Sequence, residues 1–74
     1  MKATFQTDMF EWSHWINHEV GKQYDAEMKA KSMAQQYATQ KDRPVTVSYR
    51  HEGCTCTACD ADGIHNETFH PVTI

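Results

Sequence analysis

The residues best suited to chemistry gather in one stretch of the sequence, between positions 51 and 70. All three cysteines fall within six residues there, and three of the five histidines flank them. Thiolates and imidazoles are ligands that tetrahedral zinc prefers, and two cysteines separated by two residues can present both thiolates from one turn. The stretch therefore indicates a zinc site. The expected ligands are Cys56, Cys59, His65 and His70, and Cys54 and His51 compete for a position.

The cysteine count favours reduced thiols. An odd number of cysteines is not typical of the disulfide frameworks of small secreted proteins. Cys54 and Cys56 are also too close in sequence to bridge comfortably. No basic-then-apolar leader opens the chain, and no run of residues is apolar and long enough to span a membrane. We therefore expect a cytoplasmic protein that does not act at membranes.

The spacing Cys56-x2-Cys59-x5-His65-x4-His70 resembles the zinc knuckle of retroviral nucleocapsid proteins, whose pattern is Cys-x2-Cys-x4-His-x4-Cys. The resemblance covers about 15 residues and includes Gly63, where a knuckle needs a tight turn. The middle spacing is one residue longer, and the last ligand is histidine instead of cysteine. Residues 51–74 also hold four acids and no Lys or Arg, whereas gripping nucleic acid requires cations. We expect any zinc to stabilise structure, and we expect no direct binding of nucleic acid.

Three interpretations of this loop stay open. The side chains lie unliganded in a hairpin loop, they hold a structural zinc ion, or the thiols carry redox or iron–sulfur chemistry. A redox Cys-x-x-Cys normally opens a helix in a βαβ unit, and one iron–sulfur cluster usually needs four cysteines. We expect a domain that needs no cofactor, with zinc as the cofactor that the side chains would fit.

Outside this loop the sequence offers little chemistry. His14 and His18 are four residues apart, a spacing that on a helix lets two imidazoles share a metal, but a solvated polar face is the favoured interpretation. No serine has the context of a nucleophile, and no glycine-rich loop would cradle a phosphate. A chain of 74 residues would also struggle to enclose a substrate pocket. We therefore expect a protein that is not an enzyme.

Hydrophobic periodicity predicts two helices. In the first, over 9–20, apolar residues recur at helical spacing between an acidic capping pattern, Asp8 with Glu11, and Gly21. The same stretch also alternates, although Trp15 breaks the alternation, so a strand is the alternative. In the second helix, over 25–41, small alanines form one stripe and Asp25 is the expected N-cap.

Strands are predicted on both sides of these helices. Val45–Arg50 alternates after Pro44 and predicts a half-buried strand. A short strand over 3–6 and an edge strand over 68–74, where Pro71 forbids a central position, complete the set around a polar loop at 51–67. The fold class is α+β, a small single domain in the order β-α-α-β-β, with a short antiparallel sheet packed on the alanine-striped helix.

Size and composition limit the function. The chain has 74 residues, 39% of them hydrophobic, and a formal net charge of -3. These values predict one domain with a thin core and exclude a multidomain enzyme or a strongly basic nucleic-acid binder. The aromatic residues exceed what one helix and one sheet face can bury, and interfaces favour such residues. The expected partner-binding residues are Phe10, Trp15, Tyr24, Met28, Asp60 and Asp62.

We expect a small protein-binding domain, a monomer or homodimer, that docks onto a larger partner with a basic nucleic-acid groove. In size, thin core and element order the chain resembles the compact α+β proteins that phages and mobile elements encode, anti-CRISPR proteins among them. That resemblance implies an inhibitor of a host or defence protein. The alternative is a zinc-stabilised mini-domain that serves as a structural or regulatory adaptor.

Overall fold

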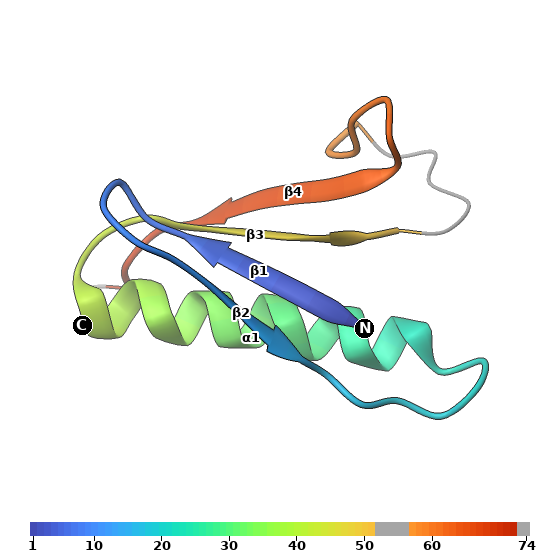
Figure 1. Cartoon of the computed structure of the whole chain (residues 1–74). Coiled ribbons are helices and arrows are strands. Elements are labelled where there is room, and N and C mark those ends of the chain that lie inside the picture. The colour runs from blue at the N-terminus through green and yellow to red at the C-terminus, as the bar shows by residue number, and fades with distance from the viewer. Residues whose placement is uncertain (52–56, 73–74) are drawn as a thin grey trace.

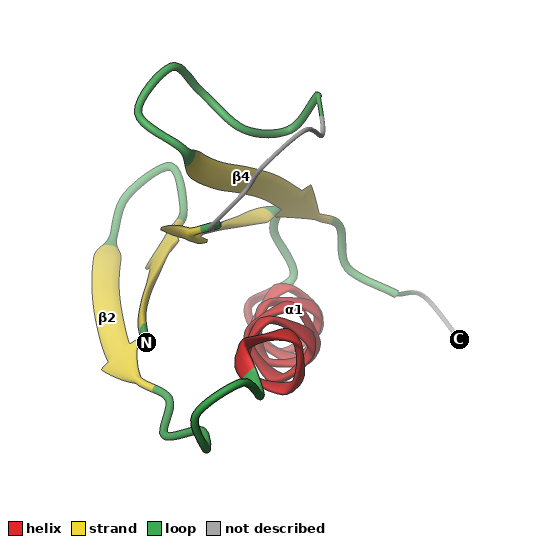
Figure 2. Ribbon diagram, turned by 90° about the vertical axis from the view of Figure 1, so that its right-hand side faces the viewer, coloured by secondary structure: helices red, strands yellow, loops and turns green. Residues whose placement is uncertain are grey.

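One helix packs against one face of a curved four-stranded sheet (Figures 1 and 2). The computed structural model describes residues 1–51 and 57–72. Neighbouring strands are antiparallel and lie in the order β2-β1-β3-β4. The α+β class is confirmed, with one helix in place of two among the described residues. The elements are β1 (Lys2–Gln6), β2 (Glu11–Trp15), α1 (Gln23–Lys41), β3 (Val45–Arg50) and β4 (Ile64–Phe69).

β1 and β2 form a hairpin where a helix was expected over 9–20. Phe5 of β1 and Trp12 of β2 are paired across the hairpin, and their rings stack with centroids 5.9 Å apart. Met9 and Val20, two members of the expected helical stripe, are exposed. As a strand, residues 11–15 gain backbone pairing with β1 along its whole length. The helix prediction is wrong, and the strand alternative is correct.

Thr7 organises the turn of this hairpin. Its Oγ1 accepts hydrogen bonds from the backbone N–H groups of Met9, at 3.2 Å, and Phe10, at 2.9 Å. The expected capping pattern serves no helix, because Asp8 pairs with Arg43 at 3.0 Å instead. Gly21 does adopt a positive φ of 80°, but it lies in the connection between β2 and α1 and ends no helix.

α1 confirms the second predicted helix and begins two residues earlier, at Gln23. Lys22 occupies the N-cap position and Asp25 lies in the first turn, so the prediction of Asp25 as N-cap is wrong. The small residues of this stripe let the helix lie close to the sheet. The stripe that faces the sheet is fully or almost fully buried and consists of Ala26, Ala30, Ala34 and Ala38.

The core lies between this alanine stripe and the two central strands. β3 has the predicted bounds, and its alternate residues point to the helix. Trp12 and Tyr37 close one side of the core, their rings edge to face with centroids 5.2 Å apart. The buried strand residues are Ala3, Phe5, Val45, Val47 and Tyr49.

β4 begins earlier than the strand expected over 68–74 and ends before Pro71. The predicted bounds are wrong, and so is the loop expected over 64–67, although the edge position is correct. β4 contains mostly polar residues, so hydrophobic alternation did not predict a strand there. They pair with β3 on the open face of the sheet, where Ser48 donates to Asn66 at 2.7 Å and the Thr46 and Thr68 hydroxyls lie 2.8 Å apart.

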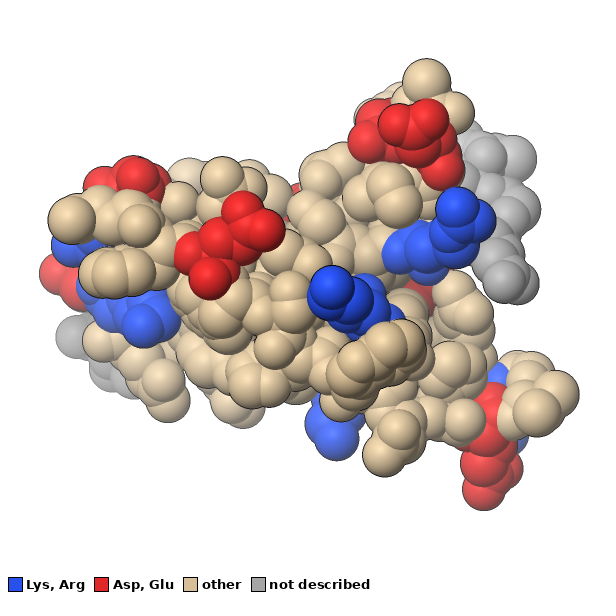
Figure 3. Space-filling model, viewed as in Figure 1, with Lys and Arg blue, Asp and Glu red and all other residues tan. Residues whose placement is uncertain are grey.

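The charges of the molecule are mixed on the face shown in Figure 3. Acidic and basic side chains alternate over this face, and neither sign forms a broad patch on it. This face therefore offers no strong field of one sign to steer a charged partner. No helix within the described residues is long and apolar enough to cross a bilayer.

Candidate metal centre

Three potential metal ligands meet where β3 ends and β4 begins. They are His51, Cys59 and His65, and their ligand atoms all lie within 4.8 Å of one another. The Sγ of Cys59 is 3.4 Å from Nδ1 of His51 and 3.7 Å from Nδ1 of His65. Zinc bonds of about 2.3 Å to sulfur and about 2.0–2.1 Å to nitrogen, at a tetrahedral angle, separate the two ligand atoms by about 3.5 Å. The observed distances bracket that value.

The alternation of the strands turns both histidines toward α1. Tyr49 of β3 and His65 of β4 are paired across the strands, and their rings stack with centroids 5.0 Å apart. His51 lies two residues beyond Tyr49 and so continues the same side of the strand. Its backbone N–H donates to the carbonyl of Gly63 at 3.0 Å. Both rings are thus held by the sheet and its end.

A tight turn places Cys59 opposite His65, and the two residues form an isolated antiparallel bridge. A side-chain oxygen of Asp60 accepts a hydrogen bond from the backbone N–H of Ile64 at 3.0 Å, and its carbonyl accepts one from Gly63 at 3.1 Å. Gly63 has a φ of 77°, which other residues rarely adopt. The turn therefore holds the cysteine against the strand that carries the histidine.

A carboxylate lies behind each imidazole. Nε2 of His65 is 3.2 Å from Oε1 of Glu67, and Nε2 of His51 is 3.9 Å from Oε1 of Glu27. Both histidines thus present Nδ1 to Cys59 and Nε2 to an acid. Metal-binding histidines usually hold a carboxylate or carbonyl on the second nitrogen, which fixes the tautomer and the ring orientation. The cluster therefore resembles a metal site beyond its direct ligands.

Glu27 is unusual because its carboxylate is largely buried between helix and sheet. The whole residue is only 8% exposed. A buried charge is costly unless a partner compensates it, and His51 is such a partner. A cation bound at Nδ1 would add positive charge to that imidazole. A metal beside Cys59 would therefore offset part of the cost of burying Glu27.

Cys59 is disulfide-bonded in this structure. The other two cysteines of the chain, Cys54 and Cys56, lie outside the described residues. The expectation of reduced thiols is therefore wrong for Cys59 here. Because metals bind the thiolate form of cysteine, the three side chains could hold a metal ion only once this bond is reduced.

The structure brings together part of the ligand set expected from the sequence. Cys59 and His65 belong to the group, and the expected competitor His51 is the third member. His70 follows the far end of β4, about 16 Å from His65 along a strand. Its carbonyl accepts a hydrogen bond from the Gln35 side chain at 2.7 Å. The expectation that His70 folds back to the cysteines treated 64–67 as a loop, and the strand prevents that approach.

Sequence reasoning missed both carboxylates. Glu27 lies on the helix, 24 positions before His51, and no local spacing links the two. Glu67 could have been found, because in a strand the residue two positions after His65 shares its face. That signal depends on recognising β4.

The residues expected to bind a partner are all exposed but lie at several places. Phe10 is 61% exposed and lines a hollow of about 250 Å³ with Lys41 near the end of α1. Tyr24, 69% exposed at the other end of the helix, lines a hollow of about 340 Å³ beside Glu27 and His51. The other four are Trp15 at 75%, Met28 at 51%, and Asp60 and Asp62 in the exposed turn.

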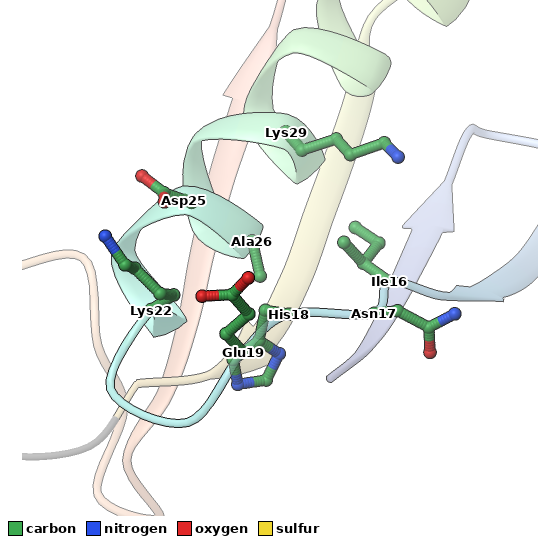
Figure 4. A pocket seen from close by; sticks show the side chains of 8 residues that line it. All are labelled: Ile16, Asn17, His18, Glu19, Lys22, Asp25, Ala26 and Lys29. Atoms are coloured by element: carbon green, nitrogen blue, oxygen red, sulfur yellow. The ribbon is translucent and has the colours of Figure 1, made fainter.

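A further hollow, of about 380 Å³, separates the β2–α1 connection from the first turns of the helix (Figure 4). Side chains of both charges line it, among them Glu19 and Lys29, so it favours neither anionic nor cationic ligands. His18 lies here, whereas His14 is on β2 with Nε2 3.0 Å from the Tyr37 hydroxyl. The helical spacing considered for the two histidines does not exist.

Comparison with known proteins found no relative of this chain. No protein-family model, no curated protein and no solved structure matches it. Its function is therefore inferred from its residues and their geometry.

Proposed function

We propose that this protein is a small non-catalytic domain that binds one zinc ion through His51, Cys59 and His65 when Cys59 is reduced. One observation carries the proposal: the Cys59 Sγ lies at zinc-ligand spacing from Nδ1 of both histidines, and each imidazole is backed by a carboxylate. The ion would join the end of β3, the turn at 57–63 and the start of β4. This role corresponds to the zinc-stabilised structural or regulatory adaptor.

The choice of zinc follows from the kind of ligand. One thiolate with two imidazoles suits zinc and neighbouring transition metals, whereas magnesium and calcium prefer oxygen. Small domains often rely on a metal because a short chain buries too little apolar surface. Here the helix contributes mainly alanines to the core, and each alanine buries little apolar area.

Metal analysis of the full chain, purified under reducing conditions, tests this proposal. We expect about one equivalent of zinc in the wild type, and much less in His51→Ala and His65→Ala. His70→Ala is the matched control, because His70 belongs to the same part of the chain but lies outside the cluster. A reduced wild type without zinc would contradict the proposal, as would an equal loss of zinc in His70→Ala.

We propose a second function, docking onto a larger protein, which the exposed aromatic side chains support. Phe10, Trp15 and Tyr24 each expose well over half of their surface. Tyrosine and tryptophan are enriched among the residues that dominate binding energy at interfaces. Inhibition of a host or defence protein with a basic nucleic-acid groove is the specific form of this proposal.

Pull-down from a host extract tests the docking surface. A partner that wild type and the exposed helix variant Gln36→Ala retain, and that Trp15→Ala or Tyr24→Ala loses, would support it. Thermal melts must show that the aromatic variants stay folded. Retention of the same partner by all variants would mean that these aromatic residues do not form the docking surface.

A further inference from the structure

We infer that Cys59 alternates between two bonds, a disulfide and a zinc–sulfur bond, so that the redox state of the chain controls occupancy of the metal centre. The inference rests on the proposed zinc site and adds its regulation. It starts from two facts about one sulfur atom. Cys59 is disulfide-bonded, and its Sγ already lies 3.4 and 3.7 Å from two imidazole nitrogens.

In the oxidised chain the two histidine side chains already lie beside the sulfur of Cys59. The His65 ring is held by stacking on Tyr49 and by Glu67, and the ring itself is almost buried. The backbone of His51 is tied to Gly63. Reduction therefore frees a thiolate that already lies beside Nδ1 of both imidazoles. Preorganised ligands of this kind lower the cost of binding.

The site is also open enough for exchange. Cys59 is half-buried rather than fully enclosed, and the hollow lined by Tyr24, Glu27 and His51 lies beside the cluster. A small thiol or a small disulfide can approach such a sulfur, whereas a fully buried structural disulfide resists exchange. Oxidation and reduction by a small-molecule thiol–disulfide couple are therefore feasible at this position.

The chemistry balances with that couple as the co-reactant. In the oxidising direction the Cys59 thiolate leaves zinc, attacks one sulfur of the small disulfide and expels one small thiolate. A second cysteine thiolate of the chain then attacks the sulfur of Cys59, closes the protein disulfide and expels the second small thiolate. Two electrons pass from two protein thiolates to the small disulfide, and Zn²⁺ is released. Reduction by two small thiols, followed by zinc binding, reverses the sequence.

Titration of the zinc-loaded, reduced chain with oxidised glutathione tests the inference. Released zinc is followed with a chromogenic chelator, and protein thiols are counted after an acid quench. We expect bound zinc to fall from about one equivalent to below about one tenth as two thiols disappear, and to return when reduced glutathione and zinc are added.

The outcomes separate this inference from the proposed function. If the reduced chain binds zinc and keeps it after two thiols have been oxidised, the redox control is wrong and the zinc site stands. If the reduced chain binds no zinc at all, both are wrong. His65→Ala provides the matched variant: it should still lose two thiols to oxidised glutathione while holding little zinc in either state. Zinc retained by reduced His65→Ala at the wild-type level would overturn the assigned ligand set.

Discussion

Glu27 and Glu67 distinguish this cluster from a chance meeting of histidines and a cysteine. Each second nitrogen of these histidines faces a carboxylate, which is the arrangement that metal-binding histidines usually show. Glu67 also lies 4.0 Å from the Lys31 ammonium, which keeps the acid in a charged network. The two acids come from different elements, so the histidines are oriented from both the sheet and the helix.

Replacing Glu27 by glutamine should weaken zinc binding to the reduced chain. The loss of negative charge behind His51 lowers the basicity of its ring, and changes of this kind cost about 10–100-fold in metal affinity. Competition against a chromogenic chelator measures the effect. Glu11→Gln, on the exposed side of β2, is the control and should bind zinc like the wild type. Unchanged affinity in Glu27→Gln would show that this carboxylate does not support the metal.

The helix and the sheet pack together because their facing side chains differ in size. α1 presents only alanines at its most buried positions, and the sheet curls over it (Figure 2). Most of the larger core side chains, such as Phe5 and Val47, come from the strands, and Tyr37 of the helix closes one side of the core together with Trp12 of β2. The spacing between helix and sheet is therefore set by small residues on one element and large residues on the other.

A larger residue in the alanine stripe should destabilise the domain. Ala34 is fully buried, so Ala34→Leu has no room and should cost about 1–3 kcal/mol of unfolding free energy. Urea denaturation followed by circular dichroism measures the change. Ser32→Leu makes the same side chain on an exposed position of α1 and should be nearly neutral. Equal effects of the two substitutions would contradict tight packing of Ala34 against the sheet.

The hairpin turn depends on one hydroxyl group. Thr7→Ala removes the acceptor for the N–H groups of Met9 and Phe10 in a residue that is only 8% exposed. Because Met9 and Phe10 are exposed, water can replace the lost acceptor, and each lost hydrogen bond should cost about 0.5–1.5 kcal/mol of unfolding free energy. Thr7→Ser keeps the hydroxyl and should retain most of the stability in the same urea titration. A loss in the serine variant as large as in the alanine variant would point to the methyl group instead.

The whole molecule is small, and its stability should respond strongly to the metal. The radius of gyration is 12.3 Å, and the candidate metal ligands lie at one end of the sheet, where three segments meet. A ligand that binds only the folded chain adds about 2.7 kcal/mol at a concentration one hundred times its Kd. For a domain of this length each kcal/mol raises the melting temperature by about 4–8 °C.

Zinc should therefore raise the melting temperature of the reduced chain by roughly 10–20 °C over the same sample in EDTA. Scanning calorimetry measures the shift, and His70→Ala should show it in full. The oxidised chain, in which Cys59 has no thiolate, should show little or none. A similar shift in the oxidised chain would place the stabilising metal elsewhere.

The local sequence was sufficient for the elements whose signals agree. α1 and β3 were predicted because the alanine stripe and the alternation of Val45–Arg50 each match one period, although the start of α1 was placed two residues too late. It was insufficient for β2, where helical and alternating patterns coexist and pairing with β1 decides the outcome. It was also insufficient for β4, whose polar residues satisfy one another across the open face of the sheet.

For the candidate metal site, too, the sequence supplied one part and the fold the other. Sequence alone pointed to the neighbourhood of the candidate ligands, because cysteine and histidine are rare and their clustering between 51 and 70 is visible without a fold. The choice of His51 over His70 depends on β4, which carries the chain about 16 Å away from His65. The contact between Glu27 and His51 depends on how the helix packs against the sheet, because the two residues are 24 positions apart in the sequence. Sequence spacing predicts the distance between two residues only when the secondary structure between them is known. Contacts between different elements depend on how those elements pack.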